Sequence, residues 1–484
     1  MIAGTLKSTD LVEEYVRQIE EHNGYLRAVS VYAPGPLHGI PVLIKDTFDT
    51  GPSLEMRKSA GAVALLNTKP TKNAEVIDKL LAAGAVILGK TTISVGTQEL
   101  SYRKENGLPC GWSAVDGQGQ SPYIPGGFDP TDSIGGHTVP GGSSSGVSIA
   151  ISAGLAAIGV GADTDASITA PAVRASLYSI RPTTGIVSVN GTVPCSKTFD
   201  TIGPMGRSVR DVADLLTALV EPGKTTIPQG GYASSATKDH GKIFRIGTLD
   251  PEVWNYPTFL VKPVPEATEQ MNRVGLDTYS KIRDGLASVF HENVDLPPVS
   301  EFMLNGKHSI YTIWDAYIEL VDVLNDYLSE LPGSPAKSLA ELVEWNQEHA
   351  AQALPTEYPS QDVLIEALNT KLSPDQIETL REHYLAVGSN LDAALQNNEI
   401  DIIVAPGDCF LTQYASAKGY PIAAVPISSI DYKSRPIGLQ VISSAHREDL
   451  LVAFVSAFED SISERQPPTA FLQASKEYNK QALP

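Results

Sequence analysis

The chain has 484 residues, of which 42% are hydrophobic and 19% are charged, an ordinary balance for a globular protein with a sizeable core. Its net charge of −20 disfavours binding to nucleic-acid phosphates and to acidic membrane surfaces, because like charges repel. We therefore expect neither nucleic acid nor membrane among its partners, and the plainest meaning of the charge is solubility.

The three cysteines, Cys110, Cys195 and Cys409, lie far apart in the sequence. This spacing argues against a disulfide framework and against a structural zinc site. The first residues lack the basic start and apolar run of a signal peptide. The small-residue stretch 147–162 is too short and too rich in Ser and Gly to cross a membrane. We expect a cytoplasmic protein.

The first part of the chain alternates between helix and strand patterns. A helix is predicted from residue 8 to about 23, because apolar residues recur at spacings of three and four. Residues 40–44 form a short apolar strand that ends at Lys45. A second helix, capped by Asn73, and an apolar strand at 85–89 follow. This order predicts an α/β fold with a mixed, largely parallel sheet flanked by helices.

A long irregular stretch at 102–146 is rich in Gly, Ser, Pro and Asp, and loops of this length are usually functional. A helix of small residues is predicted at 147–154. The strand 156–162 then leads into the turn Asp163-Thr164-Asp165-Ala166-Ser167.

Helical patterns dominate from about 220 to 395, which we interpret as a helical elaboration beside the sheet. Strand patterns return near the end of the chain, and a last helix is predicted at 448–458. These late strands are predicted at 401–404, 423–425 and 438–442.

The run of glycine and serine at 140–146 allows three interpretations. A phosphate-binding loop would need Lys-Ser/Thr after its last glycine, but Val147 follows Gly146. A nucleophile elbow of the form G-x-S-x-G would make Ser144 the nucleophile. That motif must follow a buried strand, and the preceding residues, 133–140, have the composition of a loop.

The third interpretation joins this loop to two distant segments. A lysine at the end of an apolar strand, as Lys45 is, can be desolvated, and an uncharged lysine can act as a general base. Ser167 lies in a tight turn after a strand, where backbone N–H groups can converge on an oxyanion. Ser143 could then relay a proton between Ser167 and Lys45.

Each of these features also has an ordinary structural explanation. A lysine at a strand end is usually solvated, and a serine after a strand usually caps the next helix. Composition and spacing alone therefore leave this constellation as one hypothesis among others.

Taken together, these segments resemble the amidase signature family. The similarity covers nearly the whole chain, and the helical middle is its least typical part. The Ser-Ser-Ser-Gly and Thr-Asp-x-Ser variants are most similar to the branch common in fungal and some bacterial amidases. The matching segments are the lysine strand 39–46, the Gly/Ser signature 140–146, the nucleophile turn 161–168, and the shorter runs 181–185, 200–209 and 436–440.

The resemblance implies a single α/β/α domain over residues 1–484. It implies that Ser167 forms an acyl-enzyme, that Ser143 follows a cis peptide and relays the proton, and that Lys45 is the base. The implied reaction is hydrolysis of a carboxamide C–N bond in a small-molecule amide, without a metal or an organic cofactor. A homodimer would be compatible with the family. The implied oxyanion hole consists of the backbone N–H groups of Thr164, Asp165, Ala166 and Ser167, with Gly142, Ser144 and Asp163 as supporting residues.

Some positions depart from the family pattern. Asp165 and Ala166 stand where the family usually has Gly-Gly, and an alanine would be strained if this position needs a positive φ. Thr169 replaces a frequent arginine, and the helix usually found before Gly39 is missing. These departures leave two alternatives open: an acyl-transfer or biosynthetic enzyme on the same triad, and a catalytically idle binding relative.

Overall fold

The computed structural model describes residues 8–27, 29–32, 39–94, 108–236, 241–314, 319–463, 465–468 and 471. Within these residues the main element is an eleven-stranded sheet in the order β1-β3-β2-β6-β8-β7-β14-β15-β13-β9-β10. Two short hairpins, β4–β5 and β11–β12, lie outside it. The strands are β1 (Val29–Tyr32), β2 (Pro41–Lys45), β3 (Val86–Thr91), β4 (Trp112–Ser113), β5 (Gly117–Gln118), β6 (Ile158–Asp163), β7 (Tyr178–Arg181), β8 (Thr201–Gly206), β9 (Phe244–Thr248), β10 (Ala287–His291), β11 (Met303–Leu304), β12 (Lys307–His308), β13 (Ile402–Pro406), β14 (Ile422–Ser429) and β15 (Pro436–Ser443).

The main sheet is mixed, and its parallel pairs lie toward its two ends. β2 pairs in parallel with β3 and β6, and β9 pairs in parallel with β13 and β10. The strands from β6 to β13 through the centre pair antiparallel. β2 and β15 are buried along their whole length, as strands covered on both faces are. The expected mixed sheet with flanking helices is confirmed.

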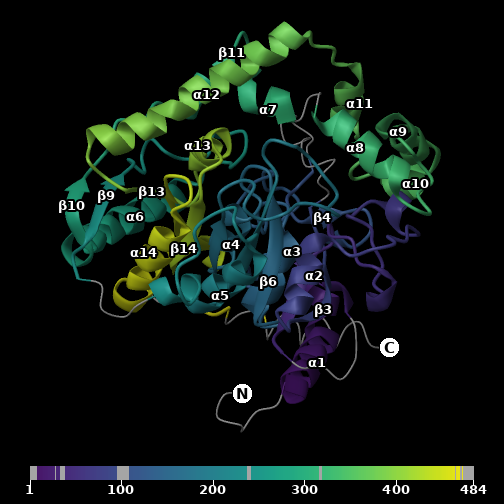
Figure 1. Cartoon of the computed structure of the whole chain (residues 1–484), viewed down its shortest axis with the longest axis horizontal. Helices are drawn as coiled ribbons and strands as arrows, with labels where there is room; N and C mark the ends of the chain where they lie inside the picture. Colours follow the sequence, from purple (N-terminus) through teal and green to yellow (C-terminus); the bar gives the residue numbers. More distant parts are fainter. Residues whose placement is uncertain are drawn as a thin grey trace.

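Helices cover both faces of the sheet (Figure 1). One apolar cluster joins the strands to α2, α5, α6 and α14, and a second joins them to α1, α3 and α4. A third cluster lies under α7 to α13, and the long helix α12 runs along the top of the molecule in Figure 1. The helices are α1 (Ser8–Leu26), α2 (Glu75–Ala82), α3 (Ser145–Ala153), α4 (Thr169–Arg174), α5 (Val209–Leu219), α6 (Pro265–Gly285), α7 (Ser309–Trp314), α8 (Glu319–Glu330), α9 (Leu339–Glu348), α10 (Ala350–Ala353), α11 (Asp362–Asn369), α12 (Pro374–Asn397), α13 (Leu411–Lys418) and α14 (Glu448–Ser461).

Helix α3 shows why small residues follow the Gly/Ser run. All nine of its residues are buried, because it packs against the inner strands of the sheet. A Cβ atom at Gly146 would lie 2.2 Å from the carbonyl oxygen of Thr92, so only glycine allows this approach. The close packing fixes the position of the loop that precedes the helix.

The segment 220–395 differs in part from the expected helical elaboration. Most of it is helical, but β9 and β10 lie within it and join the end of the main sheet. Each has only five residues, and the exposed Arg245 interrupts the apolar run of β9. β10 is the edge strand and β9 lies beside it, and strands of only five residues give a weak periodic signal.

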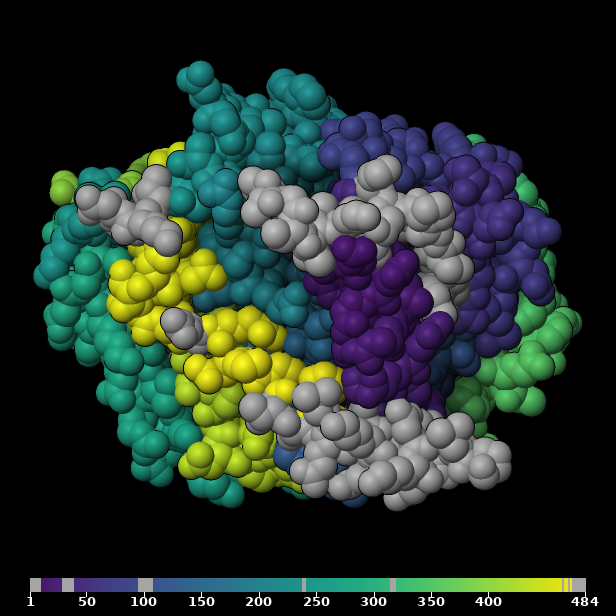
Figure 2. Space-filling view, turned by 90° about the horizontal axis from the view of Figure 1, so that it is seen from below, coloured from purple at the N-terminus to yellow at the C-terminus, as the bar shows by residue number. Residues whose placement is uncertain are grey.

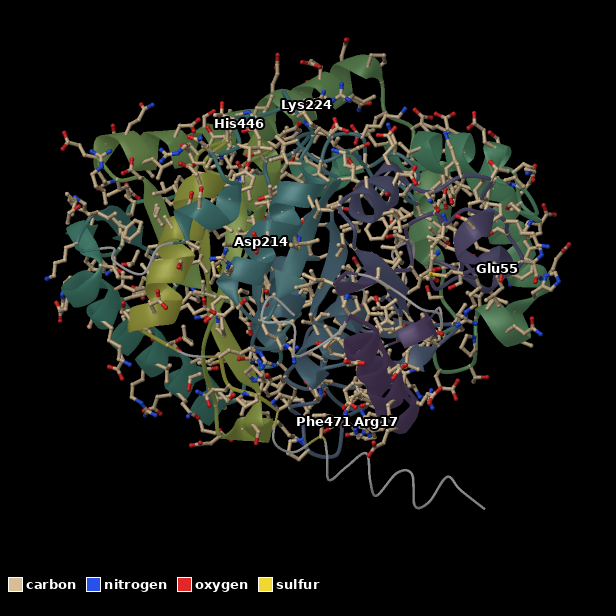
Figure 3. All side chains as sticks on the ribbon, turned by 60° about the horizontal axis from the view of Figure 1, so that its bottom comes forward. Arg17, Glu55, Asp214, Lys224, His446 and Phe471 are labelled. Atoms are coloured by element: carbon tan, nitrogen blue, oxygen red, sulfur yellow. The ribbon has the colours of Figure 1, made fainter. Side chains whose placement is uncertain are left out.

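The N-terminal helix packs against the last part of the chain. The rings of His22 and Phe471 lie 5.4 Å apart in an edge-to-face arrangement. Figure 2, which views the molecule from below, shows α1 at the surface. Figure 3 labels Arg17 of α1 and Phe471 at the same end of the molecule. None of the helices in the described ranges is both long and apolar enough to cross a membrane. The single domain over residues 1–484, the cytoplasmic location and the homodimer stay predictions.

Candidate active site

Lys45 is the last residue of β2, and its side chain is buried. Its Nζ lies 2.5 Å from Ser143 Oγ and 3.0 Å from the carbonyl oxygen of Ala162. The fold therefore brings the end of one strand into direct contact with a loop residue 98 positions further along the chain.

Two glycines shape the loop that carries Ser143. Gly141 and Gly142 have φ values of +78° and +53°, a region that glycine adopts without steric cost. A Cβ atom at Gly142 would lie 3.1 Å from the Cα of Ser167, so the glycine also lets the loop approach the nucleophile turn. As a result, the amide N–H of Ser143 donates a hydrogen bond to Ser167 Oγ at 3.1 Å.

The expected cis peptide before Ser143 is wrong for this structure. The described residues contain no cis peptide bond, so the Gly142–Ser143 bond is trans. A trans bond is lower in free energy by about 2.5–4 kcal/mol when no proline follows. The two left-handed glycines supply the change of chain direction at this point instead.

Ser167 lies in the turn between β6 and α4, and its side chain is half-buried. Asp163, the last residue of β6, holds this turn closed from inside. Its Oδ2 accepts a hydrogen bond from the N–H of Ile168 at 2.5 Å, and its Oδ1 accepts one from Arg181 Nε at 2.9 Å. Burial raises the pKa of Asp163, and the ion pair with Arg181 opposes that rise.

The turn leaves four backbone donors available. The N–H groups of residues 164–167 donate no loop or turn hydrogen bond to a backbone acceptor in the part of the chain that the structure describes. Ala166 does not have a positive φ, so its replacement of the usual glycine causes no strain of that kind. Ala166 in place of the family's usual glycine is therefore compatible with an intact turn.

Asp200 holds the same turn from a second side. Its Oδ1 accepts a hydrogen bond from the Thr164 hydroxyl at 2.7 Å. Its Oδ2 accepts hydrogen bonds from the N–H groups of Cys195 at 2.8 Å and Ser196 at 2.9 Å. Burial raises the pKa of Asp200 to about 6, although these donors oppose the shift.

Asp165 anchors the turn to the helical layer. Its Oδ2 accepts a hydrogen bond from the Tyr311 hydroxyl of α7 at 3.0 Å, and its Oδ1 accepts a long one from Ser416 at 3.4 Å. Burial, together with repulsion by Asp163, raises the pKa of Asp165 to about 6. The predicted turn 163–167 is thus fixed by three carboxyl groups, of which the sequence singled out only Asp163 as a supporting residue.

Ser144 is placed where it cannot attack a substrate. It is fully buried, and its Oγ donates to the carbonyl oxygen of Ala162 at 3.0 Å while accepting from the N–H of the same residue at 3.3 Å. The segment before it is a loop and not a strand. The nucleophile-elbow interpretation therefore fails, and Ser144 joins the Gly/Ser loop to β6.

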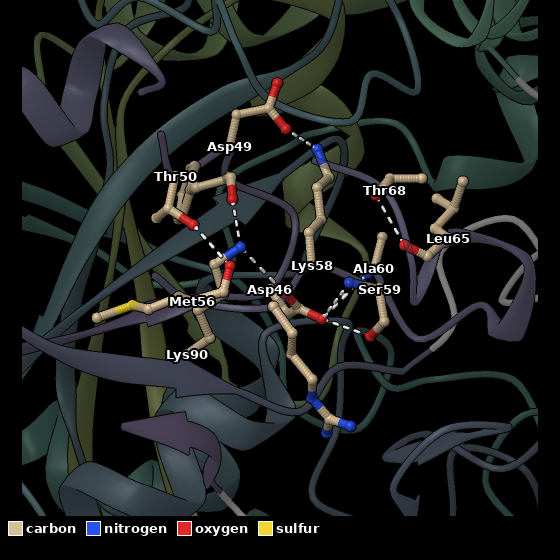
Figure 4. A network of polar contacts seen from close by, with 12 residues as sticks. Asp46, Asp49, Thr50, Met56, Lys58, Ser59, Ala60, Leu65, Thr68 and Lys90 are labelled. Atoms are coloured by element: carbon tan, nitrogen blue, oxygen red, sulfur yellow. Dashed lines mark hydrogen bonds and ion pairs between the residues drawn. The ribbon is translucent and has the colours of Figure 1, made fainter. Parts of the chain in front are cut away.

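A buried network of charged residues supports the turn after Lys45 (Figure 4). Asp46 Oδ2 accepts hydrogen bonds from the N–H and the hydroxyl of Ser59 at 2.9 and 2.5 Å. Its Oδ1 faces Lys90 Nζ at 3.3 Å, and Lys90 also donates to the carbonyl oxygen of Phe48 at 2.8 Å. Sequence reasoning missed Lys90, although a lysine inside an apolar strand was a signal for it.

The network continues to a second ion pair further from Lys45. Lys58 is fully buried and contacts the carboxylate of Asp49 and the hydroxyl of Tyr327. Burial lowers the pKa of Lys58 to about 8, and the attraction of Asp49 opposes that shift. Together the two pairs join β2, β3 and the loop after β2 into one rigid unit.

Ser167 lies between two cavities. The first is lined by Lys45, Ser143, Cys195 and Asp200 among others. The second has a different wall, and only part of it comes from the loop 102–146, whose residues 102–107 lie outside the described ranges. This wall includes Cys110 from that loop, Tyr256 and Leu260 from the segment 220–395, and Phe410 from neither, and sequence reasoning singled out none of the four as a site residue.

Several known proteins are similar to this chain over most of its length. Residues 7–452 match the family model described as Amidase. The chain is 31% identical to a protein of Arabidopsis thaliana named probable amidase, over 96% of this chain and 88% of that protein. It is 28% identical to a protein of Schizosaccharomyces pombe named as an amidase, over 98% and 85%. The X-ray structure of native peptide amidase from Stenotrophomonas maltophilia is similar with a TM-score of 0.79 and 30% identity, over 96% of each chain.

The α/β/α fold and the match over most of the chain define an amide-hydrolysing enzyme. The chain belongs to the amidase family. The resemblance inferred from the sequence motifs is therefore confirmed.

Proposed function

We propose that this enzyme hydrolyses a carboxamide through Lys45, Ser143 and Ser167, with an acyl-enzyme on Ser167. The observation that carries the proposal is the 2.5 Å distance between Lys45 Nζ and Ser143 Oγ, next to the half-buried Ser167. The buried amine of Lys45 thus reaches the hydroxyl of Ser143, and the amide N–H of Ser143 contacts Ser167 Oγ.

The two serine hydroxyls make no hydrogen bond with each other among the described contacts. Ser167 Oγ instead accepts from the backbone of Ser143. Catalytic hydrogen bonds are often loose without substrate and tighten in the complex. Rotation about the Cα–Cβ bond of Ser167 would exchange the amide contact for a hydroxyl contact, since both groups belong to one residue.

The proton path follows from this order of contacts. Ser167 Oγ attacks the amide carbonyl carbon, its proton moves to Ser143 Oγ, and the Ser143 proton moves to an uncharged Lys45 Nζ. When the C–N bond breaks, Ser143 Oγ gives its proton to the leaving amine and regains one from Lys45 Nζ. Water then attacks the acyl-enzyme by the same route and releases the free acid.

The oxyanion of each tetrahedral intermediate needs donors close to Ser167. The N–H groups of residues 164–167 support this role, because preorganised backbone donors stabilise developing negative charge. Asp163 and Asp200 would keep these donors in place, since each of them binds the turn at a different residue.

Labelling with a fluorophosphonate, followed by peptide mass spectrometry, tests the nucleophile. We expect the label on Ser167, no label and no turnover in Ser167→Ala, and retained labelling in the matched control Ser144→Ala. A label confined to Ser144 would contradict the proposal. Product analysis with a competing amine tests the second half-reaction: free acid as the main product supports hydrolysis, and predominant transfer to the amine supports the acyl-transfer alternative.

A further inference from the structure

The second cavity beside Ser167 has a wall whose chemistry points to a class of substrate. Tyr256 and Phe410 lie edge to face, with ring centroids 4.8 Å apart, and Leu260 lines the same space. The loop that carries Tyr256 and Leu260 also exposes two apolar side chains, Val253 at 68% and Phe259 at 62%. The cavity wall is therefore apolar and aromatic at Tyr256, Leu260 and Phe410, and the two exposed side chains lie outside its lining.

The two charged residues that line this cavity are already paired. Arg174 binds both oxygens of Asp408, each at 3.0 Å, and donates to the carbonyl oxygens of Gly135 and Gly136. Asp165 is bound by the Tyr311 hydroxyl at 3.0 Å, as described above. Among the described lining residues, neither charge is therefore left to receive an ion from a substrate.

Position 169, close to Ser167 in the chain, also carries no charge. Thr169 is fully buried, two residues after Ser167, and its Oγ1 has no hydrogen-bond partner. A hydroxyl here cannot balance a carboxylate as a cationic side chain would. The lining of the second cavity therefore contains aromatic rings, small residues and paired charges, and the buried residue 169 adds no charge behind it.

The proton path decides which part of the substrate faces this wall. The leaving amine must receive its proton from Ser143, which lines the first cavity together with Lys45. The acyl group then extends to the other side of Ser167, into the second cavity. We propose that this second cavity is the acyl pocket, and that the enzyme acts on amides of uncharged, apolar carboxylic acids. The inference rests on the proposed function.

Three amides of similar length test the inference, since they differ mainly at the end of the acyl chain. Hexanamide ends in a methyl group, 6-amino-6-oxohexanoate in a carboxylate and 6-aminohexanamide in an ammonium group. We expect kcat/KM for hexanamide, and for phenylacetamide, to exceed that of both charged amides by at least about 100-fold, because a buried charge without a partner is costly. Similar values for all three, or a preference for a charged amide, would overturn the inference.

Two variants connect the preference to the wall. Phe410→Ala should lower kcat/KM for phenylacetamide by about 10-fold or more, because a buried aromatic contact is lost, and should lower it for the shorter propanamide by less. Leu260→Lys should raise the ratio of 6-amino-6-oxohexanoate to hexanamide turnover by about 10-fold, because it adds a cation for the carboxylate. The matched control is Phe259→Ala, an exposed neighbour in the same loop, and it should change neither. If both wall variants leave these ratios unchanged, the assignment of the pocket is wrong.

Fluorophosphonate labelling of the same preparations separates the two proposals. Enzyme that is labelled at Ser167 but prefers a charged amide, or hydrolyses none of these amides, overturns the acyl-pocket inference and leaves the nucleophile standing. Turnover that persists in Ser167→Ala overturns the proposed function and the inference that rests on it.

Discussion

Arg181 Nε donates to Asp163 Oδ1 at 2.9 Å, and both side chains are completely buried. Arg181 also donates to the carbonyl oxygen of Phe199 at 3.0 Å, while the second oxygen of Asp163 binds the N–H of Ile168. The ion pair therefore connects the end of β6 to the residue that follows Ser167. The position of the proposed nucleophile depends on it.

Replacing Arg181 by alanine should destabilise the protein by about 3–5 kcal/mol, because Asp163 would remain buried without its partner. The free energy of unfolding from urea titration measures the loss. The matched control is Arg245→Ala, which removes an exposed pair with Asp401 at 2.9 Å and should cost less than about 1 kcal/mol. Equal losses in the two variants would contradict the structural role of the buried pair.

Adjacent serines in the Gly/Ser loop should respond very differently to the same substitution. Ser143→Ala should lower kcat by about 10²–10⁴-fold, because it removes the proposed proton relay. Ser144→Ala should keep kcat within a few-fold and lower stability by about 1 kcal/mol, because it removes only the hydrogen bonds to Ala162. Steady-state kinetics and urea titration of both variants provide the measurements, and a reversed pattern would argue against the relay.

Ala166→Gly should not improve the enzyme. Because Ala166 lies outside the positive-φ region, glycine relieves no strain there and only adds freedom to the unfolded chain. We expect a loss of about 0.4–1 kcal/mol in stability and an unchanged kcat. A clear gain in both would show that the turn needs a left-handed residue at this position.

The pH dependence of stability should reveal Asp200. Its pKa, raised to about 6 by burial, exceeds the value of an unfolded aspartate, so the folded state binds its proton more tightly. The resulting stabilisation is complete below about pH 4 and is lost as the pH rises through about 6. The pKa of Asp165 is raised as well, and its contribution to the pH dependence of stability should be the same in the wild type and in the variant.

Asp200→Asn removes this titration while keeping a carbonyl oxygen that can accept hydrogen bonds. Between pH 4 and pH 7, the unfolding free energy of the wild type should fall relative to that of the variant by at most about 3 kcal/mol. Urea titrations at pH 4, 5, 6 and 7 measure the difference. Parallel curves for the two proteins would mean that the carboxyl titrates normally.

The sequence was most informative where local patterns decide the structure. The apolar runs of β2, β3 and β6, and the late strands β13 to β15, were all predicted within a few residues. The family motifs around Lys45, Ser143 and Ser167 also pointed to three segments that lie together in the fold. The predicted cap at Asn73 was less accurate: its side chain accepts from the N–H of Gly51 at 2.6 Å, and α2 begins two residues later without a side-chain cap.

By itself, the sequence determined the class of fold, the family and the three residues proposed to carry the chemistry, because periodicity and motif spacing are properties of neighbouring residues. Only the tertiary structure decided how those residues meet. The contact between Lys45 and Ser143, the trans bond at Gly142 and the aromatic wall formed by Tyr256 and Phe410 all depend on segments far apart in the chain. Such contacts arise from packing against the sheet, and no local pattern encodes the distances that packing sets.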